Sequence, residues 1–198
     1  QKKRLDNFRG DYISTEMWHE TNARNESIIK RYTSYVNSPA NFIYSGPHLY
    51  VANPIYKNPK KICKEKADYD VIDLINLPEK YFPRSNYKPI CTEKDYFNRI
   101  TNLPWDKREK ITDYYRLIFR AMLGIPNEHT LFAAIIPPYV GHTNACVSYA
   151  FKNNSLLLNF STLSISIIYD FFTKTTGRTN LHHMLDSFPV WENHSQAI

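Results

Sequence analysis

Apolar residues recur at helical spacing most regularly between residues 106 and 123. The stripe consists of Ile111, Tyr115, Ile118 and Met122, widened by Leu117, Phe119 and Leu123. Asp106 and Glu109 have the spacing of a capping box, and Gly124 followed by Pro126 is typical of a helix end. This pattern predicts a largely buried helix over 106–123.

Runs of apolar and β-branched residues predict strands at 130–137, 144–151 and 155–160. The first run ends at Pro137 and Pro138, which cannot donate to a sheet ladder. The second half of the chain therefore combines strands with the predicted helix.

Two later segments predict helices. In 161–177 the alternation of serines with apolar residues is strand-like, yet Leu163, Ile167 and Phe171 are spaced four residues apart. We favour a helix, because a glycine at the end of this segment provides a stop. The segment 181–188 predicts a short final helix.

The first part of the chain is more polar. Residues 1–41 predict an irregular polar segment that leads into the domain, and residues 41–56 predict short strands joined by turns. The domain itself is expected over 42–190, with 191–198 as a C-terminal tail. The 198 residues suffice for one core, and the predicted fold class is α+β, with a mixed or antiparallel sheet and a few packed helices. The chain begins with Gln1, and we expect it to be part of a longer protein.

Charge and aromatic content favour a polyanionic partner. The formal net charge is +6, and the chain contains 15 Tyr, 11 Phe and 3 Trp. A lysine run is the densest positive charge; it consists of Lys57, Lys60, Lys61, Lys64 and Lys66. The run predicts either a phosphate-contacting edge or a solvated loop.

The segment 81–89 (YFPRSNYKP) is a candidate base reader. Two prolines restrict its backbone around Arg84, Asn86 and Tyr87. Arginine pairs with guanine and asparagine with adenine in the major groove, so we expect these side chains to contact DNA. The alternative is an exposed polar loop. Apolar residues of 69–78 are expected to anchor the segment 81–89 to the rest of the protein.

The segment 140–146 contains a second polar group. His142 and Asn144 are included among the candidate DNA-contacting residues. Cys146, four residues after His142, raises the alternatives of a zinc pair or a thiol nucleophile with its base. No second ligand pair stands at metal spacing and no third orienting group is identifiable, so a polar turn is favoured and no metal site is predicted.

Several enzyme classes lack support in the sequence. No glycine-rich phosphate loop and no glycine-rich turn for S-adenosylmethionine follows a predicted strand. The three cysteines, Cys63, Cys91 and Cys146, are far apart and are expected to be free thiols in a reducing compartment. No apolar run reaches the ~18 residues of a membrane span. We expect a cytoplasmic protein without a membrane partner, and no catalysis by this chain alone.

Five segments follow one another in a recognisable order: 45–63, 69–89, 111–123, 129–152 and 169–190. Together they resemble one family, the target-recognition region of bacterial adenine-specific (N6) DNA methyltransferases of restriction–modification or related phage-defence systems. Pro137-Pro138-Tyr139 is also similar to the catalytic loop of such enzymes. Ile136, however, stands where that loop has a side chain that hydrogen-bonds the adenine amine, so we interpret the prolines as a strand end.

The resemblance implies a division of labour. This chain would bind double-stranded DNA and recognise a short sequence, while a separate methyltransferase domain of the parent protein would bind S-adenosylmethionine and methylate the adenine. No cofactor is expected in this chain. The alternatives are a stand-alone DNA specificity subunit, an RNA-binding module, or a hydrolase that uses Cys146 and His142.

Overall fold

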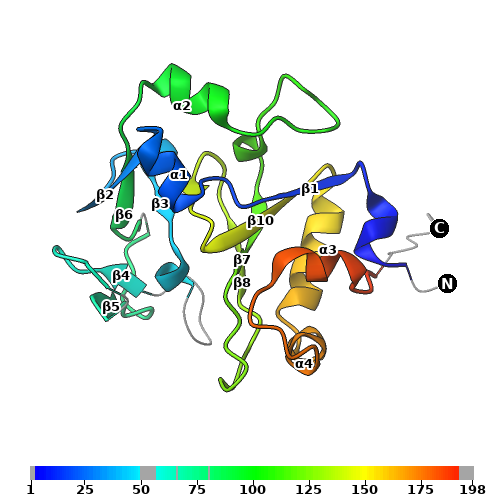
Figure 1. Ribbon diagram of the computed structural model, residues 1–198. Coiled ribbons are helices and arrows are strands. Elements are labelled where there is room, and N and C mark those ends of the chain that lie inside the picture. Colours follow the sequence, from blue (N-terminus) through cyan, green and yellow to red (C-terminus); the bar gives the residue numbers. More distant parts are fainter. Residues whose placement is uncertain (1–2, 50–56, 66, 80, 192–198) are drawn as a thin grey trace.

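A four-stranded antiparallel sheet lies at the centre of the molecule (Figure 1). The computed structural model describes residues 3–49, 57–65, 67–79 and 81–191. Within these residues the central sheet has the order β1 (Tyr12–Thr15), β10 (Cys146–Phe151), β7 (Arg116–Arg120), β8 (Ala133–Ile136). Every neighbouring pair in it is antiparallel. The sheet divides the molecule into two ends of different character.

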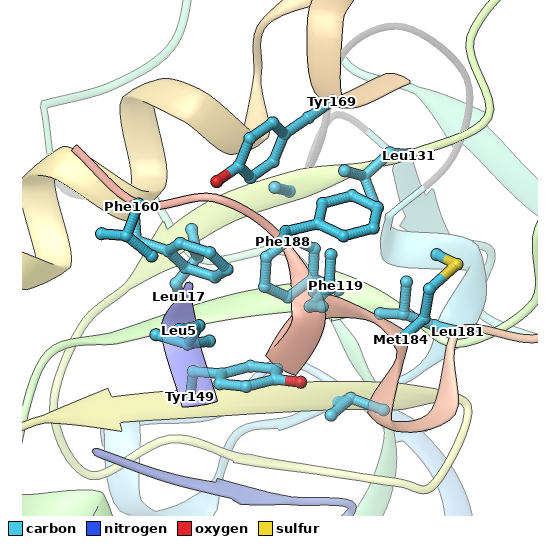
Figure 2. Packing of buried hydrophobic residues seen from close by; sticks show 14 of the residues in the cluster. Leu5, Leu117, Phe119, Leu131, Tyr149, Phe160, Tyr169, Leu181, Met184 and Phe188 are labelled. Carbon is cyan, nitrogen blue, oxygen red and sulfur yellow. The ribbon is translucent and has the colours of Figure 1, made fainter. Parts of the chain in front are cut away.

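One end is a helical layer that packs against the sheet. It consists of η1 (Leu5–Phe8), α3 (Asn154–Ser164), α4 (Ile167–Thr175) and η5 (His182–Ser187). Figure 2 shows how Phe119 and Tyr149 of the sheet meet Phe160 and Tyr169 of α3 and α4. Neighbouring rings lie at centroid distances such as 5.7 Å for Phe119 and Tyr149 and 6.0 Å for Phe160 and Tyr169. These aromatic contacts and the aliphatic residues around them form the largest core cluster.

The other end is built from short strand pairs and turns. The pairs are β2 (Ile29–Ser34) with β6 (Ser85–Pro89), β3 (Ile43–Tyr44) with β9 (Gly141–His142), and β4 (Lys57–Pro59) with β5 (Tyr69–Val71). The helical elements here are α1 (Glu20–Asn25), α2 (Glu93–Arg99), η2 (Pro39–Asn41), η3 (Gly46–His48) and η4 (Ile111–Asp113). Only β3 and β9 are parallel among the described strand pairs. The predicted α+β class with a mixed or antiparallel sheet is confirmed.

The helix predicted over 106–123 is wrong. Its centre forms β7, a strand between β10 and β8, preceded by the single turn of η4. Leu117, Ile118 and Phe119 are all buried, because side chains on both faces of this central strand contact core residues. A strand that is buried on both faces has an unbroken apolar run. Such a run also contains apolar residues at helical spacing, so periodicity alone does not distinguish it from a buried helix.

Other predicted elements meet different outcomes. The strands predicted at 130–137 and 144–151 are confirmed by β8 and β10. The strand predicted at 155–160 is wrong: this stretch lies in α3, where Asn153 Oδ1 accepts a hydrogen bond from Ser155 N at 2.7 Å and caps the helix. The helix expected in 161–177 forms as the end of α3 and as α4, and 182–187 forms the 3-10 helix η5.

The N-terminal part is not merely irregular. Residues 12–34 supply β1, α1 and β2, and β1 is an edge strand of the central sheet. Of the strands and turns expected in 41–56, β3 and η3 form, while residues 50–56 lie outside the described residues. The three cysteines are free thiols.

No single helix among the described residues has the length and apolar composition needed to cross a membrane. α3 and α4 reach them only when taken together, and they are bent by 67° at the break between them.

Candidate nucleic-acid interface

An exposed group of cations and tyrosines lies on the β2–β6 pair. Lys30 of β2 and Lys88 of β6 are directly opposite each other in the strand register. Their Nζ atoms lie 5.9 Å and 4.3 Å from the ring centroid of Tyr32, which is 51% exposed. At the far end of the pair, the Arg84 guanidinium lies 4.4 Å from the ring centroid of Tyr35, which is 58% exposed. We call these five residues the cationic face.

A β-bulge shapes this face. The register shifts between Arg31 and Ser34, so that β2 has an extra residue opposite β6. Asn86 lies opposite the bulge, only 3% exposed, and its Oδ1 accepts a hydrogen bond from Thr33 Oγ1 at 2.7 Å. Tyr32 lies within the bulge and is exposed, as is Lys30 two residues before it.

Hydrogen bonds hold Arg84 at the edge of the cationic face. Its backbone N donates to Asn58 Oδ1 at 2.6 Å, and its Nη1 donates to the Pro59 carbonyl at 3.0 Å. Its carbonyl accepts a hydrogen bond from Nε2 of the fully buried His48, whose Nδ1 accepts from Ser45 N. Burial lowers the pKa of His48 to about 4, so the ring is neutral at pH 7. Arg84 is thus partly buried and positioned by its neighbours.

The two lysines of the cationic face lie close together on opposed strands. Two like charges directly opposite each other destabilise a strand pair. In the part of the chain that the structure describes, no ion pair involves Lys30 or Lys88. Neither 27–64 nor 81–92, the sequence around these strands, contains an Asp or Glu. A bound anion would remove this repulsion.

The lysine run of 57–66 is in contrast locally neutralised. Residues 57–80 contain six lysines and five acidic residues. Lys60 pairs with Asp70 at 3.7 Å. The backbone N atoms of Lys64 and Glu65 donate to Asp68, and these hydrogen bonds lower the pKa of its carboxyl. Lys57, Lys60, Lys61 and Lys64 lie at least partly on the surface, and Lys66 lies outside the described residues.

Two residues of the predicted base-reading loop are buried, which corrects the view of 81–89 as an exposed loop. Residues 85–89 form β6, whose Ser85 Oγ donates to the Ile43 carbonyl at 3.1 Å. Tyr87 is 4% exposed and packs in the core beside Ile29. The side chains of Asn86 and Tyr87 are therefore inaccessible to a partner on the surface. Val71, Leu74 and Ile75, expected to help anchor the loop, are exposed and do not anchor it.

His142 and Asn144 also have structural contacts. His142 is fully buried; its Nδ1 donates to the Thr143 carbonyl at 3.0 Å and its Nε2 accepts from Ser148 Oγ at 2.7 Å. Burial lowers its pKa to about 3. Asn144 Oδ1 accepts from Glu20 N at 3.0 Å and holds the start of α1. Cys146 is buried in a separate apolar cluster, where burial raises its pKa. The nitrogens of His142 are thus occupied by other partners, and the geometry does not form a thiolate–imidazole pair.

An apolar groove of about 530 Å³ lies beside the end of β6. Pro89 and Cys91 line it, together with the exposed rings of Phe97 and Tyr139.

Tyr139 has a φ of 70°, an unfavourable value for a residue with a side chain. Its N donates to the Thr112 carbonyl at 2.6 Å, which helps to hold this conformation. β8 ends at the buried Ile136, directly before the two prolines, so the prolines are a strand end.

Sequence reasoning did not single out Lys30, Tyr32, Tyr35 or Lys88. The available signal was the long stretch without acidic residues, in which Lys30 and Tyr32 are two residues apart and so lie on the same face of a strand.

Among the described residues, no three His, Cys, Asp or Glu side chains form a group that could hold a metal ion. Comparison with protein-family models, curated proteins and solved structures found no match to this chain.

Proposed function

We propose that this chain is the DNA target-recognition domain of an adenine-specific (N6) DNA methyltransferase of a restriction–modification or related defence system. The observation that supports it best is the cationic face, where two opposed lysines lie beside the exposed ring of Tyr32 and take part in no ion pair among the described residues. The sequence resemblance adds the methyltransferase context. The parent's methyltransferase domain would bind S-adenosylmethionine and carry out the chemistry.

The proposed contacts follow from the chemistry of the face. Phosphate groups would occupy the space between Lys30 and Lys88 and relieve their repulsion. Tyr32 and Tyr35 offer exposed rings for contact with sugars or unstacked bases. Arg84, with one Nη donating to Pro59 and the guanidinium stacked on Tyr35, keeps donors that a base edge could accept.

Salt-dependent DNA binding tests this proposal. We expect Lys30→Ala/Lys88→Ala to weaken binding of a duplex and to reduce the slope of log affinity against log salt by roughly 1.8, the value for two phosphate contacts. Fluorescence anisotropy between 50 and 200 mM salt would measure both. A matched control is Lys152→Ala/Arg178→Ala, which removes two charges from exposed sites next to α3 and α4.

Three outcomes separate the possibilities. Equal losses in both variants would show that only net charge matters, and the cationic face would have no special role. Lys60→Ala/Lys61→Ala, in the neutralised run, should change the slope less than the Lys30/Lys88 variant. A wild-type chain that does not bind duplex DNA contradicts the proposal.

An RNA-binding module is the second candidate, because exposed tyrosines beside lysines also suit single strands. A parallel titration with single-stranded RNA distinguishes the two. Tighter binding to RNA than to duplex DNA at equal salt would favour this candidate.

A further inference from the structure

The helix α4 carries its apolar residues on the outside. Ile167, Ile168, Phe171 and Phe172 are between 41% and 78% exposed. The buried residues of the same helix are Tyr169, Asp170 and Thr173, two of which are hydrophilic. A surface helix of a globular protein normally has the reverse arrangement, with its apolar stripe toward the core.

Buried hydrogen bonds fix this orientation. Asp170 Oδ1 accepts from Thr130 N and from Leu131 N, both at 2.7 Å. The Tyr169 hydroxyl donates to the Pro189 carbonyl. Turning the helix to bury its apolar side would break these contacts and leave two backbone N–H groups without the carboxylate, at a high cost. The apolar side therefore stays outward.

Exposed apolar residues also occur on α3 and at its junction with α4, and this part of the chain carries few charges. Leu158 and Ile165 are 57% and 70% exposed. Residues 153–177 contain only two charged side chains, Asp170 and Lys174. Asp170 is buried, and Lys174 Nζ donates to the Asn127 carbonyl at 2.8 Å. We call the six exposed apolar residues of α3, α4 and their junction the apolar patch.

The size of the apolar patch approaches that of a protein interface. Aromatic side chains alone span about 150–250 Å² each, so two phenylalanines and four aliphatic residues at these exposures offer on the order of 600 Å². Patches of this size mark interaction sites, and a standard interface covers about 800 Å² on each partner.

We infer that the apolar patch is the contact between two copies of this chain. A two-fold contact brings a surface against itself, so the surface must be self-complementary. An uncharged apolar surface meets this condition, although the chain as a whole carries a net charge of +6. Ile167 with Phe171, and Ile168 with Phe172, form rows at four-residue spacing that suit helix-to-helix packing.

A membrane surface fits the patch less well than a second copy does. Helices that lie on membranes are rich in lysine and arginine around their apolar face. Lys174 is the one basic residue in 153–177, and its ammonium is bound to backbone carbonyls. The patch also lies at the opposite end of the molecule from β2 and β6 (Figure 1), so a dimer would leave both cationic faces free.

Analytical ultracentrifugation of the whole chain tests the inference. We expect the wild type to shift from monomer to dimer between about 1 and 100 µM, an ordinary affinity range for such an interface. Ile168→Ser/Phe171→Ser should stay monomeric throughout this range. Ile75→Ser/Phe97→Ser, which replaces an exposed isoleucine and phenylalanine elsewhere, should dimerise like the wild type.

A second variant guards against misfolding. Phe171→Leu keeps the patch apolar and should retain the dimer. A wild type that is monomeric at 100 µM, or a Ile168→Ser/Phe171→Ser variant that still dimerises, overturns the inference. Flotation of a monomeric wild type with lipid vesicles would also overturn it and assign the patch to a membrane.

Discussion

Buried polar side chains stabilise the end of the molecule that is built from short strand pairs. Arg116 is fully buried in β7, where its Nη2 donates to the Val140 carbonyl and its Nη1 approaches Met17 Sδ at 3.3 Å. Burial lowers its pKa to about 10. His48 and His142 are fully buried as neutral rings with hydrogen bonds on both nitrogens. Arg116 and His48 join segments that are distant in the sequence, while His142 bonds to its neighbours Thr143 and Ser148. Their polar atoms have partners inside the protein, as buried polar groups require.

The two buried histidines predict acid sensitivity. Their pKa values of about 4 and about 3 lie below the usual 6.5, so the unfolded chain binds protons that the folded chain does not. The free energy of unfolding is therefore unaffected by them above about pH 6.5 and falls as the pH drops toward 4. Each contributes a slope of up to about 1.4 kcal/mol per pH unit.

Urea unfolding at pH 7, 6 and 5 measures this slope. His48→Gln or His142→Gln should each remove about half of the slope that the pair contributes. The exposed His183→Gln serves as the matched control for loss of a surface histidine. A wild type equally stable at pH 7 and pH 5 contradicts the prediction.

At the scale of elements, the β2–β6 pair has buried residues that pack inside the protein and surface residues that form the cationic face. Its inner residues, Ile29, Ser85 and Tyr87, pack inside the protein, while Lys30, Tyr32 and Lys88 lie at least partly at the surface. The β-bulge of β2 lies opposite Asn86, whose Oδ1 accepts a hydrogen bond from Thr33 of the bulge.

Asn86→Ala should consequently reduce stability rather than alter sequence preference. The change leaves the partly buried Thr33 hydroxyl without its acceptor, and loss of such a hydrogen bond costs about 0.5–1.5 kcal/mol. Denaturant unfolding measures the loss, and the exposed Asn76→Ala serves as a control. Unchanged stability together with an altered DNA preference would restore Asn86 as a base-reading residue.

At the scale of the whole molecule, two different surfaces lie at opposite ends of the central sheet. The cationic face is on the strand end, and the apolar patch is on the helical end (Figure 1). If both proposals hold, a dimer presents two cationic faces and binds a long duplex at two places.

Such a dimer predicts avidity. We expect the wild type to prefer a duplex of about 40 base pairs over one of about 12 by at least tenfold per chain, since linked sites raise the effective concentration. Ile168→Ser/Phe171→Ser should lose most of this preference while it binds the short duplex normally. Anisotropy at fixed salt measures both lengths; an equal preference in the variant would show that length acts without dimerisation.

The sequence alone determined the α+β class, the strands β8 and β10 and the helix α4, because these depend on short-range signals: apolar runs, stops at proline or glycine, and helical spacing. The tertiary structure decided that 116–120 is a strand. The apolar residues there are compatible with a helix or a strand, and the strand is favoured because β10 and β8 pair with it on either side. It also decided which polar residues are accessible. Lys30 meets Lys88 and Asn86 is buried because β2 pairs with β6 across a long sequence separation, and no local pattern encodes that pairing.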